Sequence, residues 1–169
     1  MNPQAAINDQ VERFHLEMVE LVKKYQFRDR NEITCCGVSV SQCYALEALV
    51  HSGRMTVNKL AHRLQLSIST VTRVVEQLVK KQLVRRGKDL KDRRFHVIEL
   101  TAKGKSAYRD SWANVFKSEK TILRNVPARH RAMLIDLLKN LNTAIDQWRS
   151  CCTLKPRKGS GNGSKRCRA

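Results

Sequence analysis

The sequence is poor in acidic residues, in aromatic residues and in long apolar runs. Its 169 residues include 15 Asp+Glu against 33 Lys+Arg, a formal net charge of +18, and only 5% are aromatic. With three prolines and seven glycines, the chain is neither collagen-like nor proline-rich. No apolar run approaches the roughly 18 residues that span a bilayer, and residues 1–10 lack the basic and apolar regions of a signal peptide. We therefore expect a cytoplasmic, mainly helical protein that has no membrane segment and binds a polyanion.

The excess of positive charge is concentrated in the middle of the chain and at its end. Residues 54–105 carry 14 basic and 4 acidic side chains, a net charge of +10, whereas residues 1–53 have a net charge of −2. The last stretch, 153–169, is rich in Gly, Ser and Lys and is predicted to be a disordered basic tail. This tail either adds non-specific affinity for phosphates or is simply solvated. The charge distribution thus predicts a binding module within 54–105 on a helical scaffold.

Two short helices are predicted in this module, at 57–64 and at about 68–82, joined by a turn. Thr56 and Ser67 are suitable N-cap residues for them. The second helix has an apolar stripe that should face inward, formed by Ile68, Val71, Val74, Val75, Leu78 and Val79. Its other face presents Ser69, Thr70 and Arg73. Small polar residues and one arginine can approach base edges in the major groove; the alternative is an ordinary solvated face.

The next segment favours the DNA-binding interpretation. Residues 83–86 resemble a strand, 87–93 a polar turn, and 95–100 alternate like a returning strand. A two-stranded hairpin directly after a helix-turn-helix is a winged helix. Its tip gathers four cations that an anion would stabilise, namely Lys88, Lys91, Arg93 and Arg94. A purely structural hairpin is the alternative. We expect a mainly α fold with a small two- or three-stranded β wing.

Amphipathic helices are predicted on both sides of the winged helix-turn-helix. One covers 8–29 and is followed by a break at about 31–37; two more cover about 102–125 and 127–152. The last has a continuous apolar stripe that includes Leu134, Leu137, Leu138, Leu141 and Ile145. Such stripes need a partner surface. We therefore expect a helical dimerisation region at 1–38 and 106–152, a DNA-binding domain at 39–105, and a homodimer whose recognition helices meet two operator half-sites.

The residues from 54 to 104 resemble the MarR-type winged-helix repressors. The likeness is carried by Leu83-Val84-Arg85-Arg86, by Asp89-Leu90-Lys91-Asp92-Arg93-Arg94 and by Leu100-Thr101-Ala102-Lys103-Gly104. The resemblance implies a homodimer with six helices and a wing per subunit, bound to pseudo-palindromic, double-stranded operator DNA. Leu90 departs from the pattern, since such wings often have proline there. The tail after residue 153 has no counterpart in the family.

The resemblance also implies roles for individual residues. Ser67, Ser69, Thr70 and Arg73 would face the major groove or its phosphates. Arg93 would enter the minor groove, oriented by Asp92, because a narrow A·T-rich groove attracts an inserted guanidinium. Lys88, Lys91 and Arg94 would complete the cationic wing.

The six cysteines suggest a second function. Without an export signal they are not expected to form a disulfide framework. Cys35 and Cys36 precede the helix that contains Cys43, so three thiolates can converge, and Cys151 or Cys152 could complete the set. Three thiolates without histidine suit As(III), Sb(III), Hg(II), cuprous copper or an iron–sulfur cluster, and a fourth thiolate would suit Zn. The spacing also resembles the adjacent-plus-third-cysteine sites of arsenite-sensing repressors from another winged-helix family.

Two other interpretations of the cysteines stay open. One is redox sensing, in which one thiolate is oxidised and a neighbour forms a disulfide with it. The other is no sensory role, with Cys43 a small core residue and the others, including Cys167 in the tail, incidental.

The sequence as a whole therefore predicts a dimeric repressor that releases operator DNA when Cys35, Cys36 and Cys43 capture a thiophilic metal or metalloid. An enzyme is not expected, because no histidine lies at hydrolase spacing and no glycine-rich phosphate loop is present. The remaining alternatives are a thiol-redox repressor, a thiol oxidoreductase and a non-regulatory nucleic-acid-binding protein dominated by its tail.

Overall fold

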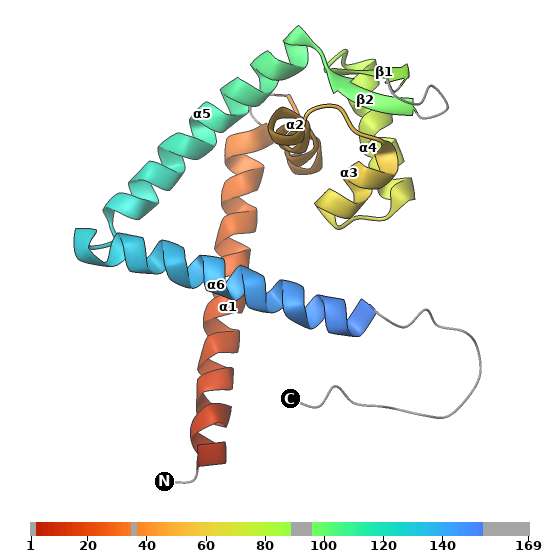
Figure 1. Ribbon diagram of the computed structural model, residues 1–169. Coiled ribbons are helices and arrows are strands. Elements are labelled where there is room, and N and C mark those ends of the chain that lie inside the picture. Colours follow the sequence, from red (N-terminus) through yellow and green to blue (C-terminus); the bar gives the residue numbers. More distant parts are fainter. Residues whose placement is uncertain (1–2, 35–36, 89–95, 154–169) are drawn as a thin grey trace, which may run out of the picture. The chain divides into compact units, whose positions relative to one another are not determined.

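The computed structural model describes residues 3–34, 37–88 and 96–153, and the side chains within 7–33, 37–88 and 96–150. The elements follow in the order α1 (Pro3–Thr34), α2 (Val40–Ser52), α3 (Val57–Leu64), α4 (Ile68–Lys80), β1 (Val84–Lys88), β2 (His96–Leu100), α5 (Ala102–Arg124) and α6 (Ala128–Thr153) (Figure 1). Two compact units are present, residues 1–119 and 120–169, and each is described by itself. The mainly α fold with a small β wing is confirmed.

Hydroxyl side chains begin α2, α3 and α4, as the sequence predicts for Thr56 and Ser67. Ser39 forms a capping box with Gln42: Ser39 Oγ accepts a hydrogen bond from the Gln42 N–H at 3.3 Å, and Gln42 Oε1 accepts one from the Ser39 N–H at 3.2 Å. Thr56 and Ser67 accept from the N–H groups of Lys59 and Thr70 in the same way. These local bonds fix where α2, α3 and α4 start.

The first helix is longer than predicted. The sequence predicts a break that starts at about residue 31, and this start is wrong, because α1 continues to Thr34. Its last turns are held by burial: Asp29 is 7% exposed and Ile33 is 2% exposed. Packing against the core therefore extends a helix that the polar sequence around Asn31 does not favour on its own.

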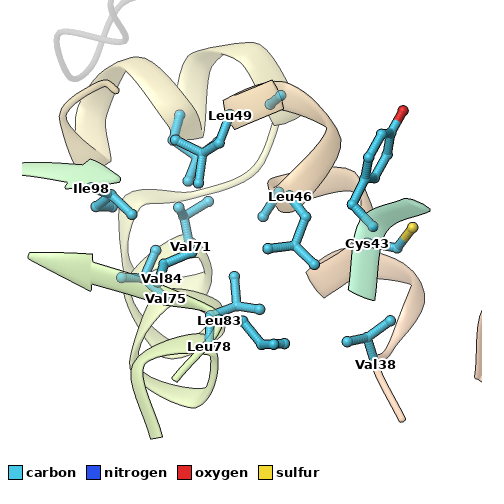
Figure 2. Packing of buried hydrophobic residues seen from close by; sticks show 14 of the residues in the cluster. Val38, Cys43, Leu46, Leu49, Val71, Val75, Leu78, Leu83, Val84 and Ile98 are labelled. Atoms are coloured by element: carbon cyan, nitrogen blue, oxygen red, sulfur yellow. The ribbon is translucent and has the colours of Figure 1, made fainter. Parts of the chain in front are cut away.

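The core of the first unit is formed by side chains from α2, α3, α4 and both strands. Leu46, Leu60, Val71, Val75 and Leu78 are fully buried, and Cys43 and Ile98 belong to the same cluster (Figure 2). Burying a large aliphatic side chain contributes about 1.5–3 kcal/mol. The core thus holds α4 by its inner face and leaves the outer face of α4 to solvent.

The wing is an antiparallel hairpin of two strands. Val84 pairs with Leu100 and Lys88 with His96 at the two ends of the register. Met55, just before α3, adds a single bridge to β2 through two backbone hydrogen bonds with Ile98, at 2.8 and 3.3 Å. The expected two- or three-stranded wing is therefore two strands plus this one bridge.

Position 104, near the start of α5, requires glycine because it lies very close to the backbone of Leu83. A Cβ atom at this position would lie 1.9 Å from the carbonyl oxygen of Leu83 and 2.9 Å from its carbonyl carbon. The same oxygen accepts hydrogen bonds at 3.1 Å from both the N–H and the hydroxyl of Thr101. Thr101 Oγ1 in turn accepts from the Gly104 N–H at 3.0 Å, so it caps α5. The start of α5 is thus held against Leu83, in the turn between α4 and β1.

The second unit consists of the end of α5 and α6. Large apolar side chains along one side of α6 are exposed, with Leu137 at 58% and Trp148 at 64%. The same is true of α1 in the first unit, where Val11 is 56% and Phe14 is 52% exposed. Each helix thus has an apolar stripe that its own unit leaves uncovered.

Candidate nucleic-acid interface

The N-terminal end of α4 is surrounded by hydroxyl groups. Ser67 Oγ caps the helix and lies 2.7 Å from Thr70 Oγ1 and 3.0 Å from Ser69 Oγ. All three residues are exposed. The Ser67 hydroxyl is therefore engaged in the cap, while Ser69 and Thr70 face solvent beside it. A helix end with exposed hydroxyl groups and a positive dipole suits contacts to phosphate or base edges.

Arg73 lies one turn further along the same outer face of α4. Its side chain is exposed, and Val71 and Val75 on the opposite face are fully buried. This confirms that the polar and apolar residues of α4 occupy different sides. The helix thus presents Ser69, Thr70 and Arg73 together on an element that the core holds in place.

Two residues assigned to the inner stripe of α4 by the sequence lie outside it. Ile68 is 55% exposed and Val79 is 37% exposed. Ile68 is the first residue of α4, where the helix emerges from the core beside Ser67 and Ser69. An exposed apolar side chain among hydroxyl groups can contact a thymine methyl group. Periodicity alone missed Ile68, because a stripe does not show where the core ends along it.

The described part of the wing is cationic. Arg85, Arg86 and Lys88 on β1 are exposed. Glu99 on β2 neutralises part of this charge, since its carboxylate pairs with Arg85 at 2.9 Å and with Arg54 at 3.6 Å. Lys88 ends the hairpin register opposite His96. The predicted tip residues Lys91, Asp92, Arg93 and Arg94 lie outside the described residues.

The cysteine cluster is only partly within the described structure. Cys43 is 5% exposed and belongs to the hydrophobic core (Figure 2). Cys35 and Cys36 lie outside the described residues, and Cys151 and Cys152 fall in α6 of the second unit, where side chains are not described. In the part of the chain that the structure describes, no group of three or more His, Cys, Asp or Glu side chains is placed to hold a metal ion.

A polar network in the first unit centres on the buried Asp29, and the sequence does not predict it. Asp29 accepts hydrogen bonds from the Tyr44 hydroxyl and from Arg28, and Arg28 also pairs with Glu119. Burial and the bond to Asp29 raise the pKa of Tyr44 above its ordinary value, so the phenol stays protonated. These residues line a small cavity of about 200 Å3 with Trp112. They join α1, α2 and α5, and no local sequence signal marks such a network.

No helix within the described ranges has an apolar stretch long enough to cross a membrane.

Comparison with known proteins agrees with this geometry. The model of the MarR family matches residues 38–96. The uncharacterized HTH-type transcriptional regulator YdgJ of Bacillus subtilis is 28% identical over 128 residues, 72% of this chain and 78% of that protein. The HTH-type transcriptional repressor MdtR of Bacillus subtilis is 30% identical over 89 residues, 53% of this chain and 57% of that protein.

The fold is also found among solved structures. A MarR family protein from Bacillus stearothermophilus superposes with a TM-score of 0.75 at 20% identity, covering 82% of this chain and 97% of that one. These relatives confirm the expectation of a regulator and not an enzyme. Residues 38–96 therefore form a winged-helix domain of the MarR family of transcriptional regulators.

Proposed function

We propose that the chain is a homodimeric repressor that binds pseudo-palindromic operator DNA with α4 in the major groove and the wing over the minor groove. The outer face of α4 is the observation that carries this proposal. It brings Ser69, Thr70 and Arg73 together on a helix fixed by its buried face. The wing adds exposed positive charge on β1, carried by Arg85, Arg86 and Lys88. We expect Arg93 to enter the minor groove with Asp92 as its orienting partner.

The dimer is supported by the uncovered apolar stripes of α1 and α6. A second copy that covers these stripes would place two α4 helices on half-sites about one helical turn, roughly 34–36 Å, apart. The similar protein MdtR is named a transcriptional repressor, and we propose repression for this chain too. In this proposal the basic tail adds positive charge but does not contribute to the preference for one DNA sequence over another.

Arg73→Ala is expected to weaken operator binding by about tenfold to a hundredfold, because a base-contacting arginine contributes about 1–3 kcal/mol. The operator is first selected with the wild-type protein from a random-sequence duplex library, and affinity is then measured by fluorescence anisotropy. Arg129→Ala removes the same side chain from exposed α6 and serves as the matched control. Deletion of 153–169 should leave the sequence preference intact. If that deletion removes most of the affinity and Arg73→Ala removes none, the protein is a tail-driven nucleic-acid binder.

The response to an inducer is proposed for Cys35, Cys36 and Cys43, with a thiophilic metal or metalloid such as As(III), Sb(III) or Hg(II). Val38 anchors the segment that follows Cys36, since it is 3% exposed in the core next to α2. A ligand that draws the Cys35-Cys36 pair toward buried Cys43 would therefore strain the start of α2. Release would follow from a change in the distance or angle between the two DNA-binding lobes.

Cys35→Ser and Cys36→Ser are expected to bind operator normally and to lose release by arsenite or mercury, because each removes one of three thiolates. Cys167→Ser in the tail is the control and should respond as wild type. Elemental analysis and thiol titration of the purified protein identify a bound metal. Release by peroxide alone, with a disulfide formed, would favour the redox alternative. Unaltered release of both variants by arsenite, mercury and peroxide would refute a sensory role.

A further inference from the structure

The C-terminal end of α4 is tied to the start of α2 by one lysine. Lys81, the C-cap residue of α4, donates hydrogen bonds from Nζ to the carbonyl oxygen of Gly37 at 2.7 Å and to Gln42 Oε1 at 2.8 Å. Gln42 is 8% exposed. Its Oε1 atom also accepts from the Ser39 N–H, so a single oxygen joins the capping box of α2 to the end of α4.

The hydrogen bonds of Lys81 differ from the apolar contacts that α4 makes with the core. Val71, Val75 and Leu78 hold the helix through apolar contacts, which are strong and have little directional preference. A helix held only by such contacts can roll or tilt by small amounts at low cost. The two hydrogen bonds of Lys81 are directional and charge-assisted, and they lie at the end of α4 opposite to Ser69 and Thr70. They therefore fix the tilt of the face that reads DNA.

The position also suits the charge of Lys81. The ammonium group lies at the C-terminal end of α4, where the helix dipole favours a cation. The next residue, Gln82, has φ +60°, so the backbone turns sharply from α4 into β1 at this point. Lys81 is thus placed where α4, the wing and α2 meet.

We propose that Lys81 is a positioning residue for operator recognition: through Gln42 and Gly37 it sets the orientation of α4, without contacting DNA itself. The inference rests on the proposed function of α4. Direct base contacts need atoms placed to within a few tenths of an ångström, whereas non-specific phosphate contacts tolerate small rotations. Loss of the tie therefore reduces specific affinity and leaves non-specific affinity unchanged.

The test compares Lys81→Met and Gln42→Leu with the wild type on two duplexes, the operator selected from a random-sequence library and an unselected duplex. Each variant should bind the operator about tenfold more weakly and the unselected duplex within about twofold of wild type. The double variant should lose no more than either single variant, because both break the same tie. Gln42→Glu should bind the operator like the wild type, since a carboxylate accepts from both Ser39 and Lys81.

Lys103→Met is the matched control. Lys103 is exposed on α5 and borders the same surface hollow as Lys81, so the variant removes equal charge nearby and should stay within about twofold on both duplexes. Thermal unfolding of every variant shows whether a loss of binding merely follows a loss of folded protein.

Three results would overturn the proposal. The first is wild-type operator affinity in Lys81→Met. The second is a loss in Lys81→Met alone, accompanied by a fall of about one in the slope of log affinity against log salt, which marks a direct phosphate contact. The third is a loss that matches the unfolded fraction. If the wild-type protein selects no preferred duplex, the proposed function fails as well, and that failure is seen before any variant is made.

Discussion

Gly104→Ala is expected to lower the free energy of unfolding by about 3 kcal/mol, toward the upper end of the effects caused by overpacking. The added Cβ would lie 1.9 Å from the Leu83 carbonyl oxygen, and this neighbour is backbone and not the flexible end of a side chain. The oxygen cannot move away freely, because it holds both the N–H and the hydroxyl of Thr101. Urea-induced unfolding, followed by circular dichroism and fitted with a shared slope, measures the change.

Gly87→Ala in β1 is the control for this prediction. A Cβ there would meet Glu99 Oε1 at 3.6 Å, which is ordinary van der Waals contact. We expect an effect within about 1 kcal/mol. If Gly104→Ala were as mild as Gly87→Ala, the close approach of α5 to Leu83 would not exist in solution. Operator binding of any folded Gly104→Ala protein should also fall, because the same contact holds α5 to the turn between α4 and the wing.

Local signals explain why the central helices could be predicted from the sequence. Thr56 and Ser67 are N-caps whose bonds reach only three residues ahead, to Lys59 and Thr70, so their effect can be read from neighbouring residues. The wing is also predicted from local signals, because its two strands with alternating apolar residues and the polar turn between them lie within one stretch of about 18 residues. The outer face of α4 follows directly from the helical period once its ends are known.

Contacts between distant segments account for what the sequence did not reveal. The network of Arg28, Asp29, Tyr44 and Glu119 joins three helices, and none of these residues has a local feature that marks it. The extension of α1 to Thr34 depends on the same packing. The spacing of Ile68 fits the apolar stripe and predicts a core position, although the core does not reach this first residue of α4. The role of Lys81 has the same origin, since Gly37 and Gln42 are about 40 residues away from it.

Leu137→Glu is expected to convert the protein to a monomer and to weaken operator binding by roughly a hundredfold or more. The apolar side of α6 leaves Leu137 58% exposed, and nearby Met133 is 59% exposed. Because Leu137 is exposed in the protomer, the substitution leaves the packing of α6 within its own unit largely unchanged. It instead places a charge on the surface that a second copy would cover, where an unpaired carboxylate is costly to bury.

The large effect on DNA binding follows from the loss of bivalency. In a dimer the second α4 binds its half-site at a high effective concentration, which raises affinity by about 10²–10⁴ over a single site. Thr143→Glu is the control: it adds the same charge to the side of α6 opposite the middle of the apolar stripe, given about 100° of rotation per residue. Analytical ultracentrifugation and anisotropy on the same samples decide the matter. If the Leu137→Glu protein is a monomer with wild-type operator affinity, one subunit is sufficient for operator binding. If it is still a dimer, the contact between subunits lies elsewhere than on α6.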